Sequence, residues 1–323
     1  MKKILRKVKI DSIDTNDLTF IYTFPVRIDE IIESIRKIHF LNPVILIEYD
    51  GKYRIISGLK RILACKSLSF DMIDAFVFES DSISELEAFL IAVYDNMSIR
   101  RLNIIEKSVI LNKLRMYHNL KDSKIIDYYM PVIGLGKSRK LLNDYLLLSK
   151  FDDVLKEHIV HRDISIRVSS LLASVSEEKL SLISEVIIKF NLGGNKIKEL
   201  LGLVDEIIER DDTNPRKLRS DLELEAVLKD ERLTLSQKWD KIISSLRDKR
   251  FPMWSKLEKG LLQDISSLNL PRNIHFIYPP YLEGDKFRIE AEFSSTDELK
   301  EFGQKLIDVS KSKELSKIIK HLF

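Results

Sequence analysis

The sequence predicts an α+β protein that is mostly helical, with a small α/β domain at residues 1–97, an all-α domain at 98–210 and a small α+β domain at 216–323. Strand and helix patterns alternate over roughly the first ninety residues. Helical spacing of apolar residues then continues to about residue 210, and strand patterns return near residue 274. The polar segment 211–215 ends in proline, which favours a linker before the last domain.

The first domain is expected to contain a β-hairpin. Residues 43–49 and 52–56 have strand character and are separated by Asp50 and Gly51, a pair that tolerates the positive φ angles of a type I′ turn. Apolar residues at helical spacing predict a helix at 28–38 before the hairpin and another at 59–68 after it, followed by a third strand at 73–78.

The other two domains are predicted from the same periodicity. In the middle domain we expect helices at 104–117, 138–148, 177–190 and 195–208. In the last domain we expect strands at 274–278 and 286–293, around Pro279 and Pro280, and a helix at 296–309.

The composition indicates a soluble cytoplasmic protein. The chain has 323 residues, of which 44% are hydrophobic and 32% charged. Its apolar runs are shorter than the ~18 residues of a membrane span, so we expect no membrane association. The basic start at residues 1–9 lacks the apolar core of a secretory signal. A single cysteine, Cys65, can form neither an internal disulfide nor a cysteine zinc site, and is expected to be a small buried residue.

Positive charge is concentrated in one part of the chain. The net charge is only +3, yet residues 98–150 contain 11 Lys and Arg against 4 Asp and Glu, a local net charge of +7. A basic helical region suggests a polyanionic partner, although a solvated helix face would have the same composition.

The stretch GLGKS at residues 134–138 looks like the end of a phosphate-binding loop. That motif requires a glycine five residues before Gly136, where this chain has Pro131, which has no N–H to donate. The preceding residues 125–130 also have the pattern of a helix end and not of a strand. We therefore predict a turn that leads into a new helix.

With a helix at 122–130 and another at 138–148, this region has the pattern of a helix-turn-helix. The second helix of that motif inserts its N-terminal part in the major groove of DNA. The polar residues in this part are Lys137, Ser138, Arg139, Lys140 and Asn143. The apolar residues that can pack against the rest of the domain are Leu141, Leu142, Tyr145, Leu146 and Leu148. Arg and Lys bind guanine edges or phosphates and Asn can read adenine, so duplex DNA is the expected partner. The turn is longer than the usual three or four residues.

Three boxes, in the same order and at plausible spacing, resemble the ParB family of chromosome and plasmid partition proteins. Residues 58–64, GLKRILA, resemble the family box G-E-R-R-x-R-A, which opens a helix. Residues 95–106, DNMSIRRLNIIE, resemble E-N-x-Q-R-x-x-L-N-P-I-E, and residues 136–139 match G-K-S-R. The resemblance covers about residues 1–210 and implies a ParB/sulfiredoxin-like N-terminal domain.

The resemblance implies that the first domain binds CTP with Mg²⁺. A glycine ahead of a helix gathers backbone N–H groups at the positive end of the helix dipole, which suits a triphosphate. The expected nucleotide-binding residues are Ser57, Gly58, Lys60, Arg61 and Asn96, and Asp95 and Asn96 are the expected metal ligands. Arg100 and Arg101, in the basic segment, are assigned to DNA binding. Alternatively, Gly58 only permits a tight turn and Lys60 and Arg61 are surface charges.

Some positions depart from the family pattern. Leu59 stands where the family has a glutamate, which argues against hydrolysis beyond a weak CTPase activity, so catalytic residues are not assigned. Sulfiredoxin needs a cysteine at the same position, so thiol chemistry is not expected. The family segment that contacts a ParA-like ATPase is not recognisable at the N-terminus, and such a partner stays an open question.

The leading hypothesis is a ParB-like, CTP-dependent DNA-binding protein of chromosome or plasmid partition or related DNA organisation. It would be a homodimer, cytoplasmic and associated with the nucleoid. Two alternatives stay open: a nucleotide-dependent phosphotransferase or nuclease on the same fold, and a nucleotide-free transcriptional regulator. The triplet HRD at 161–163 lacks the other kinase motifs, and His158 and His161 lack a third metal ligand of matching spacing.

Overall fold

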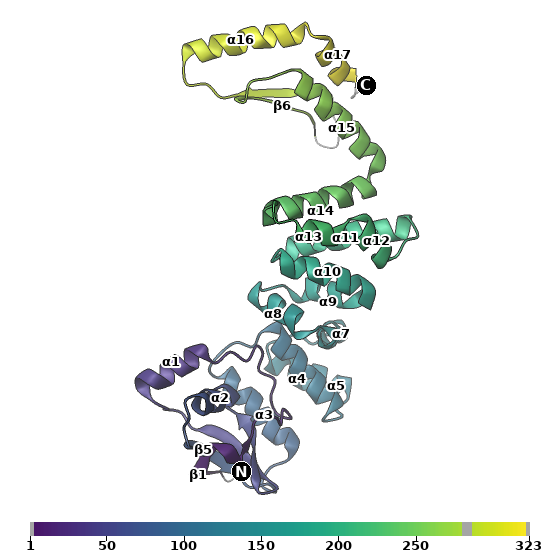
Figure 1. Cartoon of the computed structure of the whole chain (residues 1–323). Helices are drawn as coiled ribbons and strands as arrows, with labels where there is room; N and C mark the ends of the chain where they lie inside the picture. The colour runs from purple at the N-terminus through teal and green to yellow at the C-terminus, as the bar shows by residue number, and fades with distance from the viewer. Residues whose placement is uncertain (1–2, 280–285, 321–323) are drawn as a thin grey trace. The chain divides into compact units, whose positions relative to one another are not determined.

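The computed structural model describes residues 3–279 and 286–320 and divides into two compact units, Met1–Lys198 and Glu199–Phe323 (Figure 1). The boundary falls inside helix α11 (Gly194–Arg210). The predicted class, a mostly helical α+β protein with a small mixed sheet, is confirmed.

The first unit begins with a five-stranded sheet in the order β1-β5-β3-β4-β2. Its strands are β1 (Lys3–Lys9), β2 (Ile13–Asp14), β3 (Val44–Tyr49), β4 (Lys52–Ser57) and β5 (Met72–Phe78), with the short 3₁₀ helix η1 (Ile10–Ser12) between the first two. The pairs β1/β5 and β3/β4 are antiparallel, whereas β3/β5 and β2/β4 are parallel. The predicted strands are present, but the two edge strands β1 and β2 were not predicted.

The hairpin between β3 and β4 is closed by the predicted turn. Asp50 and Gly51 have φ angles of 52° and 72°, the positive values that a type I′ turn requires at both central residues. The turn pairs Tyr49 with Lys52 and so sets the register that carries Ser57 to the far end of β4, where the candidate site lies.

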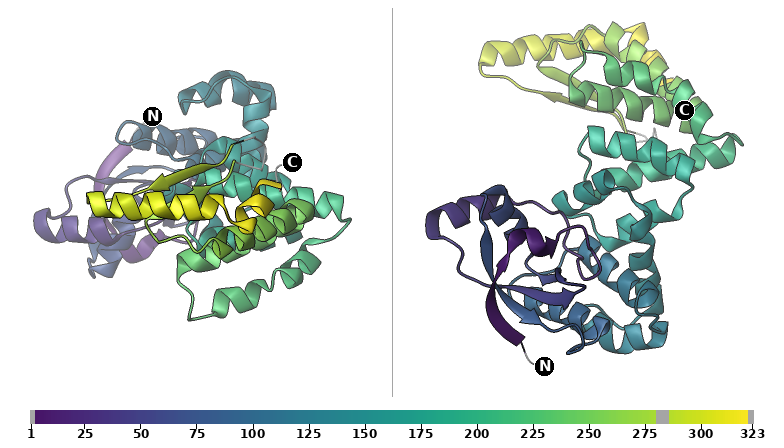
Figure 2. Two further views of the ribbon diagram at one scale, coloured as in Figure 1. Left: turned by 90° about the horizontal axis from the view of Figure 1, so that it is seen from above. Right: turned by 60° about the horizontal axis from the view of Figure 1, so that its bottom comes forward.

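Helices cover both faces of the sheet (Figures 1 and 2). Helices α1 (Asp29–Ile38) and α2 (Leu59–Ser67) pack side by side and share one apolar core with the strands, including Ile55 of β4. The next residue, Ile56, is equally buried but lies outside that core. Because successive strand residues point to opposite faces, α3 (Glu85–Met97), which contacts β4, covers the other face.

The rest of the first unit is helical. Helix α4 (Ile104–Met116) packs against α7 (Arg139–Leu147), and the buried Ser108 hydroxyl donates a 2.7 Å hydrogen bond to the Tyr145 carbonyl. Between them, α5 (Asp122–Lys124), the π-helix η2 (Ile125–Tyr129) and α6 (Met130–Val132) follow one another directly. The 3₁₀ helix η3 (Leu148–Lys150), α8 (Asp153–His161), α9 (Ile166–Ser174) and α10 (Glu177–Lys189) complete the unit.

The second unit continues with α12 (Pro215–Asp221), α13 (Leu224–Lys229), α14 (Leu235–Arg250) and α15 (Pro252–Ser267). The predicted linker at 211–215 corresponds to the turn between α11 and α12. Pro215 is the first residue of α12. The Arg210 guanidinium donates to the carbonyls of Lys249 and Arg250, both at 2.6 Å, and so satisfies the C-terminal end of α14.

The predicted strands and helix of the last domain are also present. Strands β6 (Ile274–Ile277) and β7 (Arg288–Ala291) pair antiparallel, and α16 (Thr296–Ser310) and α17 (Lys313–Lys320) follow them. Pro280, expected between the strands, lies outside the described residues. Over the described parts of the chain, every helix is too short or too polar to cross a membrane.

Candidate functional site

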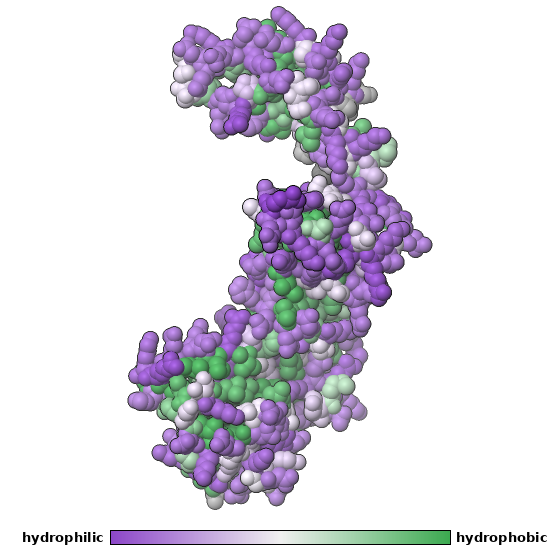
Figure 3. All heavy atoms as spheres, in the orientation of Figure 1, coloured by the Kyte–Doolittle hydropathy of each residue, from purple (hydrophilic) through white to green (hydrophobic). Residues whose placement is uncertain are grey.

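A cavity of about 870 Å³ lies where β4 ends and α2 begins, bordered by α1 and by the end of α3. Figure 3 shows apolar side chains gathered on the visible surface around α1 and α2, beside this opening. Its lining includes every residue predicted to bind nucleotide or metal, together with Arg100: Ser57, Gly58, Lys60, Arg61, Asp95 and Asn96. The structure therefore brings together residues that are up to 43 positions apart in the sequence.

Gly58 is required by the backbone at this point. It has a φ angle of 104°, and a Cβ atom placed on it would lie 2.6 Å from Cγ1 of Val44 on the neighbouring strand. Gly58 immediately precedes α2, so the first helical turn, whose N–H groups have no partner within the helix, lines the cavity. A backbone of this shape presents positive partial charge to an anion.

Lys60 and Arg61 differ in what they contact. In the described residues Lys60 forms no hydrogen bond or ion pair, and its half-buried position, with a smaller effect of the nearby Arg100 charge, lowers its pKa. The Arg61 guanidinium donates to the carbonyl oxygens of Asn42 and Pro43, at 2.6 and 3.0 Å. Lys60 is thus available to a ligand, whereas Arg61 fixes the backbone of Asn42 and Pro43, which line the cavity just before β3.

The predicted metal ligands lie at the same end of the cavity. The Ser57 hydroxyl donates a 2.6 Å hydrogen bond to Asp95 Oδ2, which fixes the carboxylate beside the end of β4. Asn96 donates from Nδ2 to the Ala92 carbonyl at 2.9 Å, and its side-chain oxygen is left to accept other bonds. No group of three or more His, Cys, Asp or Glu side chains suited to a metal occurs within residues 3–279 and 286–320.

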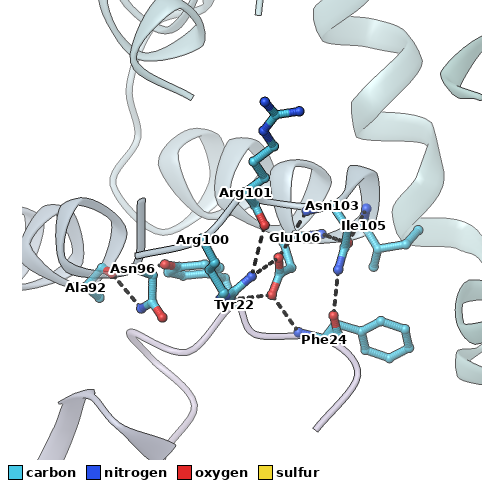
Figure 4. A network of polar contacts seen from close by, with 9 residues as sticks. All are labelled: Tyr22, Phe24, Ala92, Asn96, Arg100, Arg101, Asn103, Ile105 and Glu106. Atoms are coloured by element: carbon cyan, nitrogen blue, oxygen red, sulfur yellow. Dashed lines mark hydrogen bonds and ion pairs between the residues drawn. The ribbon is translucent and has the colours of Figure 1, made fainter. Parts of the chain in front are cut away.

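Glu106 is the centre of a polar network that sequence reasoning missed (Figure 4). Its carboxylate is 1% exposed and accepts two bonds from Arg100, at 2.6 and 2.7 Å. It also accepts from the backbone N–H groups of Phe24 and Asn103, at 3.2 and 3.1 Å. The Asn103 side chain caps α4 and donates to the Phe24 carbonyl at 2.7 Å. The loop that carries Phe24 is thereby tied to the start of α4.

The sequence did contain one local signal for Glu106. Asn103 and Glu106 have the spacing of a capping box, which the structure forms in full. The role of Tyr22 had no such signal: its hydroxyl donates to the Ala92 carbonyl at 2.9 Å, and burial raises its pKa. Arg100 and Arg101 were assigned together to DNA binding, but the structure separates them. Arg100 borders the cavity, whereas the exposed Arg101 side chain points away from the network in Figure 4.

The second predicted site lies at the start of α7. The preceding helix runs through Pro131 to Val132, and the turn that joins it to α7 contains Gly134, with a φ of 73°. Leu142 and Tyr145 are buried, as predicted, and the residues expected to face DNA are exposed except for Ser138: Lys137, Arg139, Lys140 and Asn143. Ser138 caps the helix, because its hydroxyl accepts the Leu141 N–H at 3.3 Å.

The GLGKS stretch, His158 and Cys65, for which the sequence predicted no ligand, have structural roles. A helix and not a strand precedes GLGKS, so this stretch is a turn before a helix, as predicted. His158 is buried and bonds the Leu192 carbonyl at 2.8 Å, whereas His161 is exposed. Cys65 is buried in the core of the sheet, and burial raises the pKa of its thiol.

A small mixed sheet with a glycine-started helix at a cavity, followed by helices, defines an α+β protein with a candidate anion-binding site in its first domain. Residues 1–96 match the family model described as ParB N-terminal domain. This part of the chain is therefore similar to the ParB N-terminal domain, and the predicted resemblance to the ParB family is confirmed.

Similar proteins were found both by sequence and by structure. The nucleoid occlusion protein of Bacillus cereus (strain B4264) is 27% identical over 157 residues, which are 48% of this chain and 51% of that protein. The chain thus spans about half the length of this relative. The C-terminally truncated chromosome-partitioning protein ParB from Caulobacter crescentus, complexed to the centromeric parS site, shares 18% identity, with 61% of this chain and 98% of that chain covered and a TM-score of 0.34. The same protein complexed with CTP-gamma-S shares 19% identity, covers 57% and 99%, and has a TM-score of 0.25.

Proposed function

We propose that this chain is a ParB-like DNA-binding protein that binds CTP with Mg²⁺ in the cavity of its N-terminal domain. Its role would be chromosome or plasmid partition or a related organisation of DNA. The observation that carries the proposal is the convergence of Gly58, Lys60, Asp95 and Asn96 on one cavity of a ParB N-terminal domain. These side chains and the start of α2 supply the groups that a magnesium-bound triphosphate requires.

The residues at the end of β4 fit a triphosphate. The first turn of α2 supplies N–H donors, and Gly58 allows the positive φ angle with which the chain enters this helix, at a point where a Cβ atom would clash with Val44. Lys60 borders the same space and supplies positive charge, whereas Arg100, which also borders it, is paired with Glu106. Arg61, which is bound to two carbonyl groups, would position the wall of the cavity and not bind the nucleotide directly.

Asp95 and Asn96 fit Mg²⁺, which proteins often hold through one or two carboxylates together with substrate phosphates. The ion would neutralise phosphate charge when bound. Leu59, at the position of the family glutamate, is 6% exposed and belongs to the core of the sheet, so no carboxylate is available at that position. We therefore propose that the nucleotide is bound and that hydrolysis is at most weak.

The start of α7 is the proposed DNA-binding surface. Lys137, Arg139, Lys140 and Asn143 are exposed on one helical turn or next to it, in the segment with a net charge of +7. Such a set can contact phosphates and base edges together in a major groove. The proposal includes a homodimer on DNA, cytoplasmic and associated with the nucleoid, and leaves a ParA-like partner to be tested.

Calorimetry of the full chain with CTP, ATP and GTP in the presence of Mg²⁺ tests the nucleotide site. We expect CTP to bind most tightly, and Lys60→Ala to weaken it about tenfold, as for one charge-assisted contact. Lys66→Ala is the matched control, because Lys66 is an exposed lysine at the other end of the same helix. If none of the three nucleotides binds, the nucleotide-free transcriptional regulator becomes the better interpretation. Product formation that depends on Asp95 would instead favour an enzyme.

A salt series of duplex DNA binding tests the second site. We expect log K to fall linearly with log salt concentration, because each neutralised phosphate releases counterions. Lys140→Ala should reduce the slope by about 1 and weaken all sequences alike, whereas Asn143→Ala should act on sequence preference. A slope near zero for the wild-type chain would exclude phosphate contacts.

A further inference from the structure

Asp122 lies between two arginines at the surface proposed to bind DNA. Its Oδ1 atom is 3.2 Å from Nε of Arg115 on α4, and its Oδ2 atom is 3.6 Å from a terminal nitrogen of Arg139 on α7. The carboxylate is 17% exposed, whereas the Arg115 and Arg139 side chains are 44% and 69% exposed. Asp122 thus links α4 and α7 to α5, the short helix that precedes the turn.

This arrangement restrains Arg139 without removing it from solvent. A separation of 3.6 Å is too long for a good hydrogen bond, so the carboxylate attracts Arg139 electrostatically and leaves its donors available. Arg115 is held at closer range and from another helix, which fixes the carboxylate in place. A DNA phosphate that approaches either arginine must compete with Asp122 and is also repelled by it.

We propose that Asp122 is a positioning residue that weakens binding of Arg115 and Arg139 to the phosphates of arbitrary duplex DNA. The inference rests on the proposed DNA-binding function and adds a selectivity element to the same surface. A base edge that Arg139 contacts carries no net charge and is not repelled by the Asp122 carboxylate, whereas a phosphate at the same arginine is repelled. The carboxylate thereby disfavours binding without sequence recognition.

The test compares two variants that each remove one negative charge from the same helical segment. Asp122→Asn removes the paired carboxylate. Asp127→Asn is its matched control, because Asp127 is exposed and forms no ion pair in the described part of the chain. Binding of a random-sequence duplex by the full chain is measured over a salt series, and circular dichroism confirms that each variant is folded. Asp122→Ser, which also suits a first helical turn, replaces the amide variant where that variant is unfolded.

We expect Asp122→Asn to bind the random duplex about three- to tenfold more tightly than the wild-type chain, and its salt slope to steepen by about 1 to 2 as the released arginines reach phosphates. Asp127→Asn should change affinity less than about twofold. Adding Arg139→Gln to Asp122→Asn should abolish most of the gain.

Equal effects of Asp122→Asn and Asp127→Asn would overturn the inference, because general charge would then explain both. The inference is also overturned if the wild-type chain binds DNA but Asp122→Asn leaves the affinity and the salt slope unchanged. The proposed DNA-binding function would then stand. Absence of binding by every protein, the wild-type chain included, would reject the DNA-binding function itself and the role of Asp122 with it.

Discussion

Arg100 and Glu106 form a two-pronged ion pair, with guanidinium nitrogens 2.6 and 2.7 Å from the two carboxylate oxygens. The carboxylate is almost completely buried, and the pair raises the pKa of Arg100. Arg100 borders the cavity while Glu106 caps α4, which packs on α7. The two candidate sites are therefore connected through one helix and one ion pair.

Replacing Glu106 should destabilise the first unit. Glu106→Ala leaves Arg100 and the N–H groups of Phe24 and Asn103 without their acceptor. Because the Arg100 side chain is 36% exposed, water can solvate it, and we expect a loss of about 2–3 kcal/mol in the free energy of unfolding. Denaturant titration measures it. Glu33→Ala, at an exposed position of α1, should change stability by less than about 0.5 kcal/mol. Equal losses in the two variants would show that the network does not stabilise the fold.

The part of the site that could be predicted from sequence is the part with local signals. Gly58 and the start of α2 follow from a glycine between a strand pattern and a helix pattern. Glu106 is different, because its partner Phe24 lies 82 residues away and no local pattern indicates that contact. Arg100 shows the same limit: a basic segment suggests DNA, but only the fold shows that this arginine borders the cavity.

The missed strand β1 illustrates the same limit in the fold. Its sequence, KILRKVK, leaves Ile4 and Leu5 38% and 58% exposed and buries Val8, so apolar and polar residues do not alternate along it. Its partner β5 begins about sixty residues later. The hairpin of β3 and β4, by contrast, carries its own turn signal and was predicted within one or two residues.

Gly58→Ala should destabilise the chain by about 2–4 kcal/mol, because a positive φ and a close contact with Val44 both oppose a side chain there. Gly136→Ala is the matched control: its Cβ would meet nothing within 4 Å. Thermal and denaturant unfolding measure both variants. In a Val44→Ala background the effect of Gly58→Ala should shrink by about 1 kcal/mol, since the shortest contact, with Cγ1 of Val44, is removed while the backbone strain and the 3.0 Å contact with Cβ are kept. An unchanged effect in that background would show that the contact with Cγ1 of Val44 contributes nothing to the cost.

Lys60→Ala and Arg61→Ala should separate binding from stability. Lys60 forms no bond within the described residues, so its loss should weaken nucleotide binding and leave the unfolding midpoint unchanged. Arg61 is bonded to the carbonyl groups of Asn42 and Pro43, so its loss should lower stability by about 1–3 kcal/mol and weaken binding as a consequence. Calorimetry and denaturant titration on the same preparations measure the two effects. The assignment of roles is wrong if Lys60→Ala destabilises the chain as much as Arg61→Ala.

Lys113 should make stability depend on pH above neutrality. It contacts the carbonyl groups of Leu18 and Thr19, and burial lowers its pKa to about 8. Below pH 8 the lysine is charged in both the folded and the unfolded chain, and burial of the charge opposes folding. Between about 8 and the unfolded value near 10.4, only the unfolded chain keeps the proton, so the contribution of Lys113 to stability rises with pH.

The free energy of unfolding of the wild-type chain, minus that of Lys113→Met, should therefore increase from pH 8 to pH 10. Lys121→Met, at an exposed position, should show no such increase. A difference that is flat or decreasing for Lys113→Met would mean that the folded lysine keeps its proton through this range.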